Sequence, residues 1–275
     1  MLAQIHLGHD KDQYEVAATI GGSAEILNAR TVSIEAFAKD DMEADSVAAG
    51  GGLLTAQGAE SRVKSTLGTL AQIKDTATIK AETLSIRSEH EQDFDSHSDS
   101  YSFGAASGAG AGTVNDFNSK ADVKIASGSK VEAANILVFA RNKLRKDKIN
   151  KERNTGVKFV SDETDVSVDG AVENPFNLKK SNLRTLTAAL GSVTALASRT
   201  HIGTKDSPFQ SLVEIKGELV AGARQENLID RMSGSNNAAP GLFRIETVND
   251  ILAYDYVSLD SIGVAGFSYA QSIID

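Results

Sequence analysis

The sequence contains no cysteine and no tryptophan, only 3 prolines, and aromatic residues make up just 5% of its 275 positions. The absence of cysteine excludes a disulfide framework, a thiolate metal site and a cysteine nucleophile. Large aromatic side chains bury much of the surface in ordinary globular cores, so their scarcity argues against one globular core. The apolar residues are mostly Ala, Val, Ile and Leu, which suit a thin core of small stacked side chains.

Long apolar runs are also missing, because no stretch approaches the roughly 18 residues of a membrane span. The formal net charge of -9 disfavours a general binder of nucleic acid or anionic membranes, which needs clustered Lys and Arg. The N-terminal stretch MLAQIHLGHDKDQYEV lacks the basic and apolar regions of a signal peptide. It starts as though inside a repeat, so we expect an excerpt or mature fragment of a longer protein.

A repeated strand pattern dominates the rest of the sequence. The apolar positions of QIKDTATIKAETLSIRSEH recur in KIASGSKVEAANILVFARN, where Ile125 follows Ile73 by 52 residues. Related copies surround Ile26 and Ile251, each with one extra residue before its second apolar pair, and a weaker copy covers 215–229. A fixed period of this kind is typical of repeat architectures. We expect Ile26, Ile79, Val131 and Ile251 to form one inward-facing stack.

Each period also contains a segment of small residues. GGLLTAQGAESRV (51–63) is echoed by FGAASGAGAGTVN (103–115) and by LGSVTALASRTHI (190–202), with Leu54 aligned to Val193 and Val63 to Ile202. A helix is the alternative for these segments, but each interior Gly costs a helix about 0.5–1 kcal/mol relative to Ala. We therefore interpret each period as two turns, one rich in Gly, Ala and Ser and one rich in Val, Ile and Leu.

These patterns predict an all-β chain, folded as a right-handed parallel β-helix (β-solenoid) with loop excursions. Residues 1–275 form a single segment of roughly ten turns, about 50 Å long at the 4.7–4.9 Å spacing of neighbouring strands. Three segments interrupt the pattern: an acidic one (88–100), a strongly basic one (141–153) and a turn-forming one (232–241). We predict that all three leave the core, and that 141–158 forms a basic protrusion because its charges resist burial.

The repeats AAGGGLLTAQGAESRVKSTLGTLAQIKDTATIKAETLSIRS and AASGAGAGTVNDFNSKADVKIASGSKVEAANILVFARN resemble the large filamentous adhesins of bacteria. These are haemagglutinin-like and leukotoxin-like surface proteins whose stalks are right-handed parallel β-helices. The resemblance covers most of 19–261 and lies in pattern and composition, and the charged segment 141–180 departs from it. It implies an extracellular or cell-surface stalk that mediates attachment or cell–cell and biofilm contact. It also implies export through a dedicated outer-membrane partner.

No catalytic signature is present. The sequence has no Gly-rich phosphate loop, no HExxH, no G-x-S-x-G and no calcium-binding nonapeptide, so we expect no enzymatic activity and no cofactor. The stretch DFDSHSDS offers Asp93, Asp95 and Asp99 as oxygen ligands, but it lacks the central Gly and the closing Glu of a calcium loop. A solvated acidic loop is the favoured interpretation, without a metal.

Partner binding remains the expected role of the exposed charges. The basic candidates for binding an acidic matrix polysaccharide or another cell-surface molecule are Lys143, Arg145, Lys146, Lys148, Lys151 and Arg153. Tyr254 and Tyr256 form the best aromatic platform for a sugar ring, or else they cover an edge of the core. We expect no specific nucleic-acid binding. Unpaired end turns would template self-association. Two alternative functions stay open, a β-helical polysaccharide-active enzyme and a self-assembling extracellular matrix filament protein.

Overall fold

The computed structural model describes residues 1–7, 16–146, 183–205, 208–222, 241–255 and 257–275. Every regular element in these ranges is a β-strand. The strands are β1 (Leu2–Leu7), β2 (Val16–Ile20), β3 (Glu25–Ser65), β4 (Gly68–Ile73), β5 (Thr78–Phe117), β6 (Lys120–Ile125), β7 (Lys130–Lys146), β8 (Leu183–Ala188), β9 (Gly191–Ile202), β10 (Gln210–Ile215), β11 (Glu218–Ala221), β12 (Phe243–Leu252), β13 (Val257–Ile262) and β14 (Ala265–Ile274). Within the described ranges there is no helix of a length and apolarity that would cross a bilayer.

Both sheets of the structure are built from parallel pairs of repeat copies. The larger sheet follows the order β1-β3-β5-β7-β11, with β8, β9, β12, β13 and β14 joined to it, and the smaller has the order β10-β6-β4-β2. Ile73 pairs with Ile125, and Ile79 pairs with Val131. The predicted period of 52 residues is therefore confirmed at these positions, as is the all-β class.

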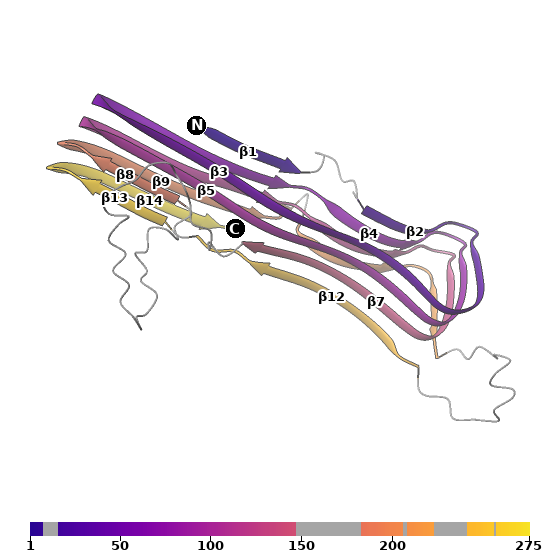
Figure 1. The fold of residues 1–275 in the computed structure, drawn as a ribbon. Helices are drawn as coiled ribbons and strands as arrows, with labels where there is room; N and C mark the ends of the chain where they lie inside the picture. The colour runs from indigo at the N-terminus through magenta and orange to yellow at the C-terminus, as the bar shows by residue number, and fades with distance from the viewer. Residues whose placement is uncertain (8–15, 147–182, 206–207, 223–240, 256) are drawn as a thin grey trace, which may run out of the picture.

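The chain visits the stack once in each period, and we call each visit a level. Level 1 is β2 and β3, level 2 is β4 and β5, level 3 is β6 to β9, and level 4 is β10 to β14. Figure 1 shows that the long strands run away from the end that holds β2 and β4, reverse at the far tip and come back. Each level thus has an outward run and a return run.

This path corrects the predicted number of turns. The apolar copy and the small-residue copy are the outward and return runs of one level, because each pairs with its own equivalent in the next period. One period therefore makes one level, and the expected ten turns become four levels plus β1. The five strands of the path β1-β3-β5-β7-β11 span about 20 Å at the usual strand spacing, where about 50 Å was expected.

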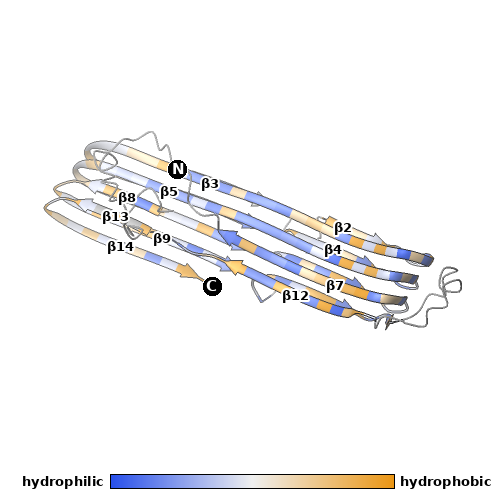
Figure 2. Ribbon diagram, turned by 60° about the horizontal axis from the view of Figure 1, so that its bottom comes forward, coloured by the Kyte–Doolittle hydropathy of each residue, from blue (hydrophilic) through white to orange (hydrophobic). Residues whose placement is uncertain are grey.

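The space between the outward and return runs changes in character along the strands. Near β2 and β4 it is filled by stacked Val, Ile, Leu and Ala side chains, and Figure 2 shows their alternation with hydrophilic residues. Farther along, the rings of Phe94 and Phe117 meet across the two runs with centroids 4.5 Å apart. Toward the tip the interior is polar, as in the hydrogen bond of 2.8 Å between Thr113 and Ser198. The core is thus apolar at one end and hydroxyl-rich at the other.

Tight backbone geometry marks both ends of each level. At the turn before the outward run, Ser23, Thr76 and Gly128 all take left-handed conformations, with φ of 60°, 65° and 81°. At the far tip, a β-carbon on Gly104 would collide with the carbonyl oxygen of Gly52. Glycine is needed there because the backbones of neighbouring levels approach each other closely. An extra residue in level 1 forms a bulge between Ile26 and Ala29, as the sequence predicts.

The inward stack is confirmed for Ile26, Ile79 and Val131, but the fourth predicted member is wrong. Leu219 of β11 occupies that place beside Val131, whereas Ile251 pairs with Leu144 at the far end of β7. The weaker copy, rather than the copy around Ile251, therefore supplies the start of level 4. The small-residue echo is also shifted, because Val193 shares its register with Ala56 rather than Leu54.

The acidic segment 88–100 does not leave the core, because it lies wholly within β5. Its alternate side chains, including Phe94 and Ser98, face the interior. Of the acids between them, Glu91, Asp93 and Asp95 are half-buried, whereas Glu89 and Asp99 are buried. The basic segment is corrected in part. Residues 141–146 complete β7, since Leu144 is buried against Phe94 and the neighbouring cations have acidic partners.

The remaining parts of the two other excursions lie outside the described residues. These are 147–158 of the predicted protrusion and 232–240 of the turn-forming segment. The register does fix how much chain separates the flanking strands. Lys146 pairs with Phe94, and Leu183 pairs with Ser98. The chain between these two positions is residues 147–182 in level 3 but only the three residues 95–97 in level 2.

Candidate functional site

The outer face of the outward runs carries a row of alternating charges. Lys39, Glu91, Lys143 and Asp250 occupy the same register position in levels 1 to 4, and we call this row the charge ladder. Within it, Lys143 Nζ lies 3.3 Å from Glu91 Oε1, and Lys39 Nζ lies 3.7 Å from Asp93 beside the ladder. Opposite charges on neighbouring strands stabilise the pairing and disfavour slipped registers.

Asp250 is the acidic centre of this face in level 4. Its Oδ2 accepts hydrogen bonds from Arg145 at 3.1 Å and from Arg141 at 3.3 Å. The hydrogen bond from Arg145 is the largest of the effects that hold the pKa of Asp250 below its ordinary value. Level 3 thus presents a basic strip that is held between the acids of level 2 and Asp250.

A second ion pair lies inside the stack. Lys146 Nζ is 2.6 Å from Asp255 Oδ1, and both side chains are almost fully buried. The ammonium also lies 5.8 Å from the ring centroid of Phe94 and 5.9 Å from that of Tyr254. Ser272 donates a further hydrogen bond of 2.7 Å to Asp255. This cluster joins the end of β7 to the segment between β12 and β13 and to β14.

The electrostatics of this pair follow from its burial. Loss of water lowers the pKa of the Lys146 ammonium, against the raising effect of Asp255. Burial alone would raise the pKa of Asp255, but the Lys146 charge and the hydrogen bonds outweigh it, so the pKa lies below the ordinary value. The carboxylate is therefore held in its ionised form.

The predicted partner-binding residues fall into four groups. Lys143 and Arg145 lie on the outer face with acidic partners, while Lys146 is buried and is not offered to a partner from solvent. Tyr254 is half-buried beside Lys146, which fits the interpretation that it covers an edge of the core. Outside the described residues lie Lys148, Lys151, Arg153 and Tyr256. Partner binding itself stays a prediction.

Sequence reasoning missed the two aspartates that organise this region, Asp250 and Asp255. The signal for Asp250 was an opposite charge at the position equivalent to Lys143, which was missed because level 4 was aligned on Ile251. Asp255 has no such signal, because it lies in the segment between β12 and β13. Sequence reasoning also missed two buried histidines. His90 Nε2 lies 2.6 Å from Asp40 Oδ2, and His97 contacts Asp95 through the same ring atom. In the described ranges, no three or more His, Asp or Glu side chains group so as to hold a metal ion.

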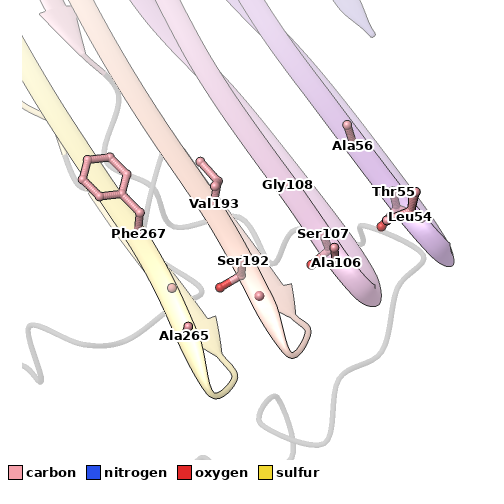
Figure 3. A pocket seen from close by; sticks show the side chains of 12 residues that line it. Leu54, Thr55, Ala56, Ala106, Ser107, Gly108, Ser192, Val193, Ala265 and Phe267 are labelled. Carbon is pink, nitrogen blue, oxygen red and sulfur yellow. The ribbon is translucent and has the colours of Figure 1, made fainter.

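A shallow groove of about 830 Å³ crosses all four levels near the tip. Figure 3 shows its lining on four neighbouring strands, with Val193 and Phe267 as its larger side chains at one end. The lining consists of Gly, Ala, Ser, Thr, Val, Leu and Phe residues and includes no acidic or basic side chain. The groove therefore lacks the paired carboxylates that glycoside hydrolysis requires.

The comparisons with known proteins give no match: no family model, no curated protein and no solved structure is significantly similar to this chain.

Proposed function

We propose that this chain is a segment of a right-handed β-solenoid stalk in a filamentous adhesin of the bacterial surface or the extracellular space. In this role it spaces and displays other parts of the adhesin and so mediates attachment or cell–cell and biofilm contact. It is not an enzyme. The stacking of repeat copies in one parallel register carries this proposal, because each level adds the same contacts regardless of how many levels precede it. A stalk built this way lengthens without a larger core.

Two features support a mechanical role. The first is the continuous pairing of β3 with β5, which runs from Glu25 to Ser65 along a single level with one bulge. The second is the charge ladder, whose alternating signs penalise sliding of one level past the next. Both resist a force that would shear the levels apart. The uncharged groove at the tip favours display over catalysis.

Attachment to an acidic polysaccharide remains part of the proposal. The charges available for it are those of 147–153, because Lys143, Arg145 and Lys146 already have acidic partners.

A self-assembling matrix filament protein is the second candidate function. It is favoured by the strand edges of level 4, which among the described strands pair only with level 3.

Single-molecule pulling tests the mechanical role. A stack that unfolds level by level should release about 180 Å of chain for each of levels 1 and 2, which is 52 residues at 3.3–3.6 Å each, and about 310 Å for level 3, where the register partners Lys120 and Gln210 are 90 residues apart. Release of the chain without such steps would contradict a modular stalk.

In parallel, the purified chain should be incubated with alginate as an acidic polysaccharide. Cleavage that is abolished by a single carboxylate substitution would replace the stalk with an enzyme.

A further inference from the structure

The far tip of the stack, where the outward runs reverse, carries no charged side chain in any of the four levels (Figure 1). The stretches that run into and out of the reversal are 46–59, 100–115, 185–198 and 261–274, and none contains Asp, Glu, Lys, Arg or His. Charged residues make up 24% of the chain, so each stretch would hold about three at the average density. Since the four stretches lie in one parallel register, they form a single end of the molecule, which we call the uncharged tip.

Large apolar side chains are exposed on the uncharged tip. Leu190 is 67% exposed and Val193 is 56% exposed, although they belong to level 3, which has a paired level on each side. Their exposure therefore follows from the direction of the side chains and not from the ends of the stack. The other exposed large apolar residues here are Leu53, Leu54, Ile262, Val264 and Phe267, of which Figure 3 shows Leu54 and Phe267. A group of this kind on neighbouring strands indicates a contact surface.

The backbone of the tip has its hydrogen bonds within the stack. The amide of Leu190 donates to the carbonyl of Ala105 in level 2, and its carbonyl accepts from the amide of Ala265 in level 4, each at 3.1 Å. On either side of the reversal, register pairing between levels continues along the strands. Backbone that is bonded in this way can enter an apolar medium without leaving its polar groups unpaired.

The hydroxyl groups of the tip are also engaged. Thr55 and Ser102 meet across the two runs at 2.8 Å, and Ser192 and Ser261 meet at 2.6 Å. The hydroxyl of Ser107 is buried. A protein partner needs about one hydrogen bond for each 100–200 Å² of interface, and these side chains are not free to make it. The hydrocarbon of a lipid bilayer requires no hydrogen bond, so it fits this surface better than a protein or a sugar.

Polarity returns in steps along the return runs, as it does across a membrane interface. Phe267 is followed on the same face by Tyr269, whose hydroxyl donates to Gln271 Oε1 at 3.0 Å. Tyr rings favour the boundary between hydrocarbon and headgroups. The first charged residue after the reversal in level 1 is Glu60, in the register of Gln271. On the outward side the shortest uncharged approach is 261–263 of level 4, about 10 Å long, and interfacial helices insert to about 5–10 Å.

We propose that the uncharged tip inserts into one leaflet of a lipid bilayer, with Leu190, Val193 and Phe267 among the acyl chains and Tyr269 at the headgroups. The net charge of -9 favours lipids without net charge over anionic ones. This inference goes beyond the stalk function and does not rest on it, because stacking of the levels and lipid contact depend on different side chains.

Sedimentation with phosphatidylcholine vesicles tests the proposal. The purified chain should bind the vesicles, and Leu190→Glu should weaken binding about tenfold or more, because it places a charge in hydrocarbon. Leu27→Glu is the matched control, since Leu27 is exposed near the start of β3, at the other end of the outward run. Added salt should leave binding by the parent unchanged, because no charged group takes part in the contact. Circular dichroism and melting temperature show whether each variant is folded.

Tryptophan fluorescence locates the contact, because the chain has no native Trp. Addition of the same vesicles should shift the emission of Leu190→Trp to shorter wavelength, since the indole then leaves water. The emission of Leu27→Trp should not shift. A shift of equal size in both variants would contradict insertion by the tip.

Vesicle binding that is lost in Leu190→Glu and kept in Leu27→Glu supports the proposal. A folded chain that does not bind the vesicles would overturn it, as would equal binding by both variants. Binding only to phosphatidylglycerol vesicles, abolished by salt, would assign the contact to cations and overturn it too. Self-association abolished by Leu190→Glu, without vesicle binding, would assign the tip to a second copy instead. A chain that unfolds level by level but does not bind vesicles would leave the stalk function standing.

Discussion

Lys146 and Asp255 are separated by 109 residues in the chain, yet their charged groups lie 2.6 Å apart in the interior. The ammonium belongs to the last residue of β7, and the carboxylate belongs to the next level of the stack. This pair therefore joins levels 3 and 4 at the point where the chain leaves one level for the long segment 147–182.

Removal of one member of this pair should destabilise the fold strongly. Asp255→Asn or Lys146→Met leaves an uncompensated buried group, which typically costs about 3–5 kcal/mol. The double variant Lys146→Met with Asp255→Leu should recover much of this loss, because neither charge is then buried alone. Urea unfolding measures the three free energies. A double variant whose loss equals the sum of the single losses would show that the pair is not coupled.

The same carboxylate should make stability depend on acidic pH. The pKa of Asp255 is lower in the folded state than the ordinary 3.8, so the unfolded chain binds more protons in that range. Its stabilising contribution is complete above the ordinary pKa and is lost as the pH falls through the lower folded value. Asp255→Asn should flatten this part of the curve of unfolding free energy against pH. An unchanged curve in the variant would assign the acid sensitivity to other carboxylates.

Gly104 at the tip should not tolerate a side chain. A β-carbon there meets the backbone oxygen of Gly52, which cannot rotate away, so Gly104→Ala should cost about 1–3 kcal/mol. Gly58→Ala is the matched control, because nothing lies within 4 Å of its β-carbon. Equal melting temperatures for the two variants would show that the levels are not closely packed at the tip.

The apolar stack gives a second contrast between matched substitutions. Val131 is fully buried between Ile79 and Leu219, so Val131→Asp should cost several kcal/mol by burying an unpaired carboxylate. Val193→Asp places the same charge on the exposed face of β9 and should change the melting temperature little. A mainly helical far-UV circular dichroism spectrum of the parent chain would refute the all-β fold altogether.

The long segment between β7 and β8 should be dispensable for the stack. Residues 147–182 take the place of three residues in level 2, so a three-residue linker with the sequence of Asp95, Ser96 and His97 should span the gap. We expect little change in stability from this replacement. Binding to alginate should fall if the cations of 147–153 carry it, and binding by the parent should weaken with added salt. A large loss of stability would show that this segment is part of the core.

The strongly periodic parts of the fold could be predicted from the sequence. Ile73, Ile79 and their partners 52 residues later are apolar at equal spacing, and the structure pairs them as the pattern indicates. The size of a level could not be predicted in this way. Two short turns would give the same sequence period as one long level made of an outward and a return run. The two arrangements differ in whether the outward and return runs contact each other, as Phe94 and Phe117 do.

The charged segments were misread for a different physical reason. A run of acids such as 88–100 usually indicates a solvated loop, but here alternate positions face inward. Between them, Glu91 pairs with Lys143 of level 3 and Asp93 pairs with Lys39 of level 1. The partners of Glu91 and Asp93 come from other levels, so local composition does not reveal them. Leu144 within the basic run was the one local sign of a strand, and it is buried against Phe94.

The pairing of level 1 with its copy 52 residues later in level 2 is tested most directly by cysteine cross-linking, because the chain has no native cysteine that could form other disulfides. Ser33 is the register partner of Ser85, and neighbouring parallel strands bring α-carbons within the 4.4–6.8 Å that a disulfide requires. The double variant Ser33→Cys with Ser85→Cys should form an internal disulfide on mild oxidation. The double variant Ser33→Cys with Gly58→Cys, spaced for a turn of about 25 residues, should stay reduced. The opposite result would contradict the four-level stack and restore the shorter turn.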